Sequence, residues 1–93
     1  MLAIQLEATY RDDDEYFELN ETYPVVAITK SDDIDTAVDC LRELMSENGW
    51  GDFNFSRYGT VKGSDEAPKS FGEPKEWKKS LEESGAIYIV YRK

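Results

Sequence analysis

Six carboxylates and four aromatic rings fall within one short segment, residues 10–24. The carboxylates belong to Asp12, Asp13, Asp14, Glu15, Glu18 and Glu21, and the rings to Tyr10, Tyr16, Phe17 and Tyr23. Carboxylate oxygens are the ligands that calcium and magnesium prefer, so metal binding is the first chemistry to consider. An EF-hand loop starting at Asp12 would need glycine and glutamate where this chain has Phe17 and Tyr23. We therefore expect no dedicated metal site and no cofactor.

A second set of acids recurs every four residues: Asp35, Asp39, Glu43 and Glu47. On a helix, residues four apart lie in one row, and each neighbouring like-charged pair is slightly destabilising. Four helical residues rise about 6 Å, and one DNA strand presents a phosphate about every 3.4 Å along its axis. The row therefore has roughly the spacing of every second phosphate. This permits DNA mimicry, and a solvated face that only keeps the chain soluble is the alternative.

The side chains that usually carry catalysis are scarce. The chain has no histidine, which excludes a Ser–His or Cys–His pair, and its one cysteine, Cys40, borders an apolar helical stripe. Zinc sites are disfavoured for the same reason. No glycine-rich phosphate-binding motif occurs. We therefore expect a protein that is not an enzyme.

Hydrophobic periodicity places these acids on elements of an α+β fold, a mostly antiparallel sheet of about four strands with one long and one short helix on one face. Alternation predicts a strand over residues 2–10, an irregular hairpin arm over 15–29 and a strand over 53–62. A further strand is expected over 86–91, and we place it in the centre of the sheet because it is apolar on both faces. A long helix should begin at Ser31 or Asp32 and stop at Asn48-Gly49. A short helix should span 74–84 after a loop over 62–73, whose role stays open. The order is β-β-α-β-α-β, in a single domain covering 1–93.

The charge is unevenly distributed between the two halves of the chain. The total is −9, but residues 1–52 hold fourteen acidic and three basic residues (−11), whereas residues 53–93 hold six and eight (+2). Phosphates and anionic lipids would repel the acidic half, so we expect neither direct nucleic-acid binding nor a membrane partner. The lone cysteine and the absence of a visible signal segment favour the cytoplasm.

A small, highly acidic, histidine-free α+β chain resembles in type the phage-encoded inhibitors of bacterial defence, such as anti-CRISPR proteins and other DNA mimics. The resemblance is carried by the segment Arg11–Tyr16 and by the row from Asp35 to Glu47, and it involves no aligned motif. It implies a non-catalytic inhibitor that occupies the basic nucleic-acid site of an effector or nuclease in a bacterial host cell.

The predicted partner-binding residues are Asp12, Asp13, Asp14, Glu15, Tyr16, Glu18, Asp35, Asp39, Glu43 and Glu47. Tyrosines mixed with carboxylates suit a protein interface, because rings anchor and acids meet Arg or Lys. Tyr10 and Phe17 are expected in the core, and Tyr16 and Tyr23 at the surface. Two alternatives remain: an immunity protein or antitoxin that neutralises a basic toxin, and a structural or metal-binding domain whose acids only solvate it. The oligomeric state stays open.

Overall fold

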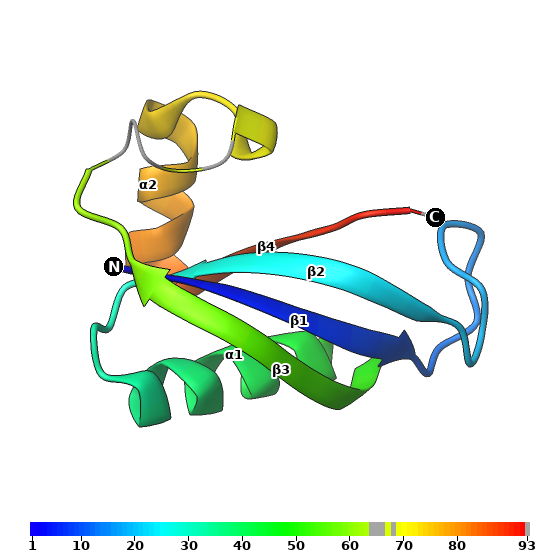
Figure 1. Cartoon of the computed structure of the whole chain (residues 1–93). Helices are drawn as coiled ribbons and strands as arrows, with labels where there is room; N and C mark the ends of the chain where they lie inside the picture. Colours follow the sequence, from blue (N-terminus) through cyan, green and yellow to red (C-terminus); the bar gives the residue numbers. More distant parts are fainter. Residues whose placement is uncertain (64–66, 68, 93) are drawn as a thin grey trace.

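The computed structural model describes residues 1–63, 67 and 69–92. A four-stranded antiparallel sheet has the strand order β3-β1-β2-β4. Along the chain the elements are β1 (Leu2–Tyr10), β2 (Thr22–Thr29), α1 (Ile34–Glu47), β3 (Trp50–Thr60), the 3-10 helix η2 (Lys69–Phe71), α2 (Pro74–Ser84) and β4 (Ala86–Val90). The predicted α+β class and the β-β-α-β-α-β order are confirmed (Figure 1).

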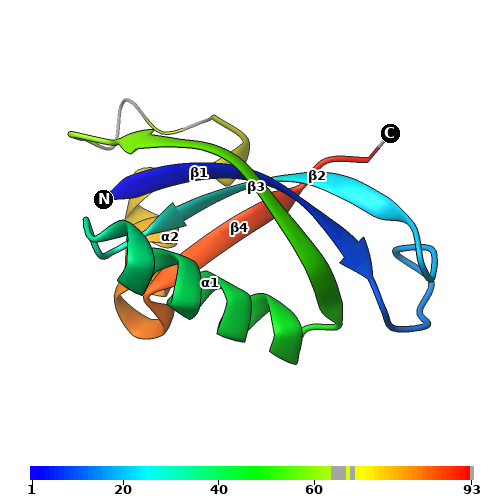
Figure 2. The ribbon, with the colours of Figure 1, turned by 60° about the horizontal axis from the view of Figure 1, so that its bottom comes forward.

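The main core lies between the sheet and α1. The alternation in β1 turns Leu2, Ile4, Leu6, Ala8 and Tyr10 toward the helix, and all five are buried. The three-to-four-residue spacing in α1 buries Ala37, Leu41 and Met45 against them. Figure 2 shows α1 running along this face of the sheet, so its opposite side faces solvent.

The second helix lies on the opposite face of the sheet, so the prediction that both helices share one face is wrong. Trp77 and Leu81 of α2 are buried against Ile28 of β2, whose neighbour Ala27 points the other way, into the core under α1. Figure 1 shows α1 and α2 on either side of the strands. The predicted bounds of this helix are confirmed: Pro74 opens it and Gly85 caps it in the left-handed conformation, with φ +81°.

The last strand is at an edge of the sheet and not in its centre. Among the described residues β4 pairs with β2 alone, while β1 and β2 occupy the middle. Its apolar residues on both faces have another cause: Tyr88 packs on the α1 side and Ile87 on the α2 side. Two helices on opposite faces thus give an edge strand the composition of a central one.

The boundaries near the acidic segments also differ from the expected ones. α1 is capped by Asp33, whose carboxylate accepts a hydrogen bond from the backbone N–H of Thr36 at 3.0 Å. The predicted cap Ser31 instead accepts from the N–H of Asp33, and Asp32 pairs with the N-terminal amine. Asn48 ends α1 as expected.

In the loop over 62–73, residues 64–66 and 68 lie outside the described residues. Within the described chain, every helix is too short or too polar to cross a bilayer.

Candidate functional site

The acidic segment forms the connection between β1 and β2, at the end of the molecule opposite α2 (Figure 1). It does not continue as the expected hairpin arm, because Asp14 folds it back on itself. The Asp14 carboxylate accepts hydrogen bonds from the backbone N–H groups of Tyr16 at 2.8 Å and Phe17 at 3.2 Å. Its second oxygen accepts a hydrogen bond from the Tyr10 hydroxyl. The segment is therefore a loop held by its own side chains.

The contact between Tyr10 and Asp14 changes the acidity of both groups. The hydrogen bond to Asp14, followed by burial, raises the pKa of Tyr10 to about 12. The same bond lowers the pKa of Asp14, burial opposes this, and the two backbone N–H groups and the nearby Arg92 lower it further. Asp14 is thus held ionised by hydrogen bonds that its charged form receives.

Four aromatic rings form a floor beneath this loop. The rings are those of Tyr10, Phe17, Tyr23 and Trp50, and their centroids lie between 4.8 and 5.9 Å apart, mostly edge to face. The prediction that Tyr10 belongs to the core is confirmed, and Phe17 is half-buried against the core. Tyr23 is half-buried, and its hydroxyl accepts from the N–H of Glu18 at 3.0 Å. The rings therefore fix the loop from below and leave its acids at the rim.

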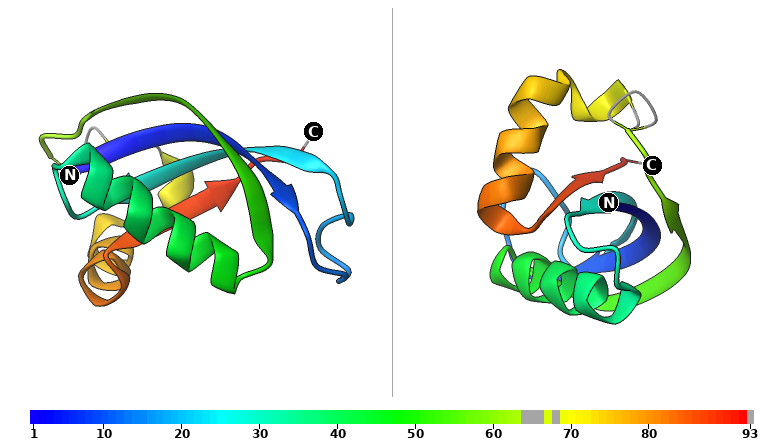
Figure 3. Two further views of the ribbon diagram at one scale, coloured as in Figure 1. Left: turned by 90° about the horizontal axis from the view of Figure 1, so that it is seen from below. Right: turned by 90° about the vertical axis from the view of Figure 1, so that its left-hand side faces the viewer.

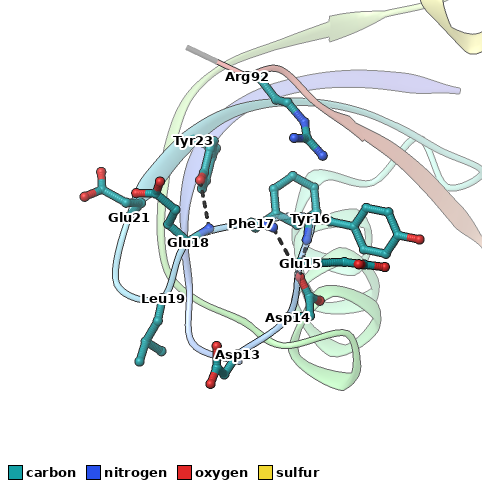
Figure 4. Close-up of a pocket in the computed structure, with 10 residues that line it drawn as sticks. All are labelled: Asp13, Asp14, Glu15, Tyr16, Phe17, Glu18, Leu19, Glu21, Tyr23 and Arg92. Atoms are coloured by element: carbon teal, nitrogen blue, oxygen red, sulfur yellow. Dashed lines mark hydrogen bonds between the residues drawn. The ribbon is translucent and has the colours of Figure 1, made fainter.

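The rim of the loop is exposed. Asp12, Asp13, Asp14, Glu15, Tyr16 and Glu18 are all solvent-exposed, as their predicted role requires. Tyr16 retains 61 % of its surface and the neighbouring Leu19 retains 51 %. All of these residues except Asp12 line an open hollow of about 590 Å³. Figure 4 shows Arg92 reaching over it. Leu19, Glu21 and Arg92 were not among the predicted site residues. Arg92 is brought here by the pairing of β2 with β4, which the local sequence pattern does not specify.

The helical row is confirmed as a row. Asp35, Asp39, Glu43 and Glu47 are all exposed on the side of α1 that faces away from the sheet. Within the described chain none of the four takes part in an ion pair. Arg42, the one basic residue of α1, lies over the Phe55 ring of β3 instead, with its guanidinium carbon 5.3 Å from the ring centroid. The carboxylates are therefore left uncompensated.

The loop and the helical row adjoin at the C-terminal end of α1. The backbone N–H of Arg11 donates to the Gly49 carbonyl at 2.7 Å. Gly49 has φ +91°, and a Cβ there would lie 2.9 Å from the Cβ of Asp12, so only glycine fits this approach. Figure 3 shows the end of α1 leading into β3 beside this loop. The two acidic surfaces are thus neighbours in space, although sixteen residues separate Glu18, the end of the run in the loop, from Asp35, the start of the row.

The single base inside the acidic loop does not neutralise its acids. The Arg11 guanidinium forms an ion pair with Asp52 and a hydrogen bond of 2.6 Å to the side-chain oxygen of Asn20. Both partners lie outside the run of acids from Asp12 to Glu18. The loop therefore projects negative charge toward solvent, as the helical row does.

This arrangement can present negative potential and one exposed ring, that of Tyr16, to a partner. Among the described residues no three acidic or cysteine side chains come together as metal ligands do. Cys40 is half-buried, and its thiol lies 3.6 Å from the Ser84 carbonyl. No family model matches the chain, and no curated protein or solved structure is significantly similar to it. Its function must therefore be inferred from the geometry of these two surfaces.

Proposed function

We propose that this chain is a non-catalytic inhibitor that binds a basic, nucleic-acid-handling protein and occupies its nucleic-acid site. The observation that carries the proposal is the row of four exposed carboxylates on α1, from Asp35 to Glu47, which form no ion pair with any residue that the structure describes. The row spans twelve helical residues, or about 18 Å, which corresponds to about five phosphates of one DNA strand. A rigid helix can therefore offer a basic groove a series of charges at repeated spacing.

The row is maintained at a cost in stability. Like charges four residues apart on a helix destabilise it by about 0.2–0.5 kcal/mol per pair, and the row contains three such pairs in succession. Lysines at alternate positions would convert each repulsion into an attraction of similar size. That such compensation is lacking on this face supports selection for charge over stability.

The β1–β2 loop adds features that a solvating surface does not need. Tyr16 and Leu19 are exposed in the middle of the acids, where they can bury apolar area against a partner. Hydrogen bonds at Asp14 hold the loop in one conformation, so little conformational entropy would be lost on binding. Carboxylates around such anchors would speed encounter with a cationic partner and reject anionic ones.

The proposal includes neither a catalytic step nor a cofactor, and it places the protein in the cytoplasm of a bacterial cell. Inhibition would follow from occupancy alone, because a nucleic acid and this chain would compete for the same basic groove. The partner would be a nuclease or another nucleic-acid-binding effector.

Affinity capture with competition by DNA tests the proposal. The immobilised chain should retain basic proteins from a bacterial lysate at low salt, and the retained protein should be released by duplex DNA. Retention should weaken as salt rises from about 50 to 500 mM, since exposed charge pairs are screened over a Debye length that shortens from about 10 Å at 0.1 M salt to about 3 Å at 1 M. A basic protein that salt releases and DNA does not would contradict occupancy of a nucleic-acid site and favour the immunity-protein alternative.

A matched pair of variants separates the row from total charge. The row variant carries Asp35→Asn, Asp39→Asn, Glu43→Gln and Glu47→Gln. The control variant carries Glu7→Gln, Glu73→Gln, Glu76→Gln and Glu83→Gln, which are exposed acids elsewhere on the chain, and it changes net charge by the same amount. Capture should be lost in the row variant and kept in the control. Equal capture by both variants would refute a specific role for α1.

A further inference from the structure

Arg92 reaches over the acidic hollow from the C-terminal end of β4. The preceding residue fixes its position: the Tyr91 N–H donates to the Pro24 carbonyl at 2.9 Å, and the hydroxyls of Tyr91 and Ser70 are 2.8 Å apart. The Arg92 guanidinium carbon lies 5.2 Å from the centroid of the Phe17 ring. Figure 4 shows the guanidinium group pointing toward this ring.

The hollow beneath Arg92 has the chemistry of a guanidinium site. Phe17 supplies an aromatic face, and the rim carries the carboxylates of Asp13, Asp14, Glu15, Glu18 and Glu21. Arg92 nevertheless takes part in none of the ion pairs among the described residues. Its cation is therefore held by the ring and the surrounding field, without a fixed carboxylate partner. About 590 Å³ of open space remains beside it, which is within the size range of ligand pockets.

We propose that this hollow is a recognition site for an arginine side chain of the partner, and that Arg92 occupies it as a placeholder in the free chain. The inference rests on the proposed function and specifies which side chain of the partner the β1–β2 loop would bind. Two independent observations meet here: the acid-rimmed ring, and a guanidinium group of the chain's own already seated on that ring. On binding, an arginine of the partner replaces Arg92 over Phe17.

Arginine suits this site better than lysine. Its guanidinium is planar, so it stacks on an aromatic face while its N–H groups reach carboxylates in the plane. The lysine ammonium is compact and strongly hydrated, and it gains less from the ring. A cation–π contact at an exposed site corresponds to about a two- to fivefold difference in affinity.

Calorimetric titration with short peptides tests the site without the unknown partner. The probes are a capped peptide with three arginines separated by Gly-Ser and the same peptide with lysines, at about 150 mM salt. The arginine peptide should bind about two- to fivefold more tightly than the lysine peptide. Arg92→Ala should bind the arginine peptide about two- to fivefold more tightly than the unchanged chain, because the placeholder is gone.

Lys79→Ala is the matched control, since it removes one positive charge from an exposed position of α2 at the far end of the molecule (Figure 1). It should leave peptide affinity almost unchanged at this salt concentration, where the Debye length is about 8 Å. Equal binding of the two peptides, no measurable binding, or equal gains from Arg92→Ala and Lys79→Ala would overturn the proposal.

The peptide titration tests the arginine site and the capture experiment tests the proposed function, so the result of one does not determine the result of the other. The row variant of α1 should keep its preference for the arginine peptide while it loses capture of the basic protein. Retained capture and DNA competition, together with no arginine preference, would remove the arginine site and leave the proposed function standing. A preference for the arginine peptide, without capture of any protein that DNA can displace, would remove the proposed function and leave the arginine site standing.

Discussion

Asp14 connects the buried and exposed parts of the β1–β2 loop. One of its oxygens fixes two backbone N–H groups of the loop, and the other accepts from the phenol of a buried ring, Tyr10. The run Asp12–Glu15 thus contains two kinds of residue. Asp14 shapes the loop through several hydrogen bonds, whereas Glu15 has an exposed side chain that is available for contact. Residue type and spacing did not distinguish these roles, because they depend on where the ring of Tyr10 points.

The bond between Tyr10 and Asp14 predicts an unusual titration. Of the six tyrosines, Tyr10 should ionise near pH 12, while burial raises the pKa of Tyr88 as well. A phenol whose folded pKa is raised stabilises the fold fully below the ordinary value of 10.0 and loses that contribution as pH rises toward 12. Ultraviolet titration of tyrosinate should show this late step, and Tyr10→Phe should remove it. Persistence of the step near pH 12 in Tyr10→Phe would assign it to another ring.

The ends of the elements place the two acidic surfaces. Asp33 caps the start of α1, so the row from Asp35 starts within the first turn, and Gly49, just after the C-cap Asn48, packs against the loop. At the other end of the sheet Gly85 ends α2 and turns the chain into β4, which carries Arg92 to the hollow. Caps and turns therefore determine which acids become neighbours.

Substitution of Gly85 tests whether the turn between α2 and β4 requires glycine. Gly85 has φ +81°, and a Cβ there would lie 3.0 Å from the Cys40 sulfur, so Gly85→Ala should lower the free energy of unfolding by at least about 1–2 kcal/mol. Gly59→Ala is the control, because Gly59 lies in β3 with no atom within 4 Å of a Cβ. Urea denaturation should show a clear loss for the first variant and a change within about 1 kcal/mol for the second. Similar losses in both would contradict the strained turn.

Local patterns predicted the elements well and their arrangement poorly. The alternation in β1, the stripe in α1 and the Pro74–Gly85 punctuation are local signals, and each corresponds to an observed element. The face on which α2 packs depends on Ile28 and Ile87 meeting Trp77 across strands, which no single segment encodes. The same holds for the site. The helical row followed from spacing, but the approach of the loop to Gly49 and the position of Arg92 follow from tertiary pairing.

The molecule as a whole separates its charges. The acidic loop lies at one end, next to the C-terminal end of α1, whereas α2 at the other end carries three lysines and three glutamates and has no net charge (Figure 1). Such a distribution orients a charged partner before contact, which favours encounter through the acidic end and the outer side of α1. It also means that the proposed binding role of the row and the stability of α1 make opposite demands on the same residues.

That conflict predicts a variant that is more stable and less functional. The row variant removes three like-charged pairs without changing helix propensity much, so its free energy of unfolding should rise by about 1 kcal/mol. For a chain of this size this corresponds to a thermal midpoint about 4–8 °C higher. The control variant loses favourable Glu–Lys neighbours on α2 and should be no more stable than the unchanged chain. A row variant that is less stable would show that the carboxylates serve the fold.

The most direct test of the central claim is the affinity of the captured basic protein, once purified, for the unchanged chain, the row variant and the control variant at one salt concentration. Neutralising the whole row removes its exposed charge pairs with the partner, which should weaken binding by about tenfold or more. The control variant has the same net charge as the row variant, and its affinity for the partner should stay within about twofold of that of the unchanged chain. Equal affinities for the two variants would show that overall charge alone attracts the partner, and the α1 row would then have no specific part in binding.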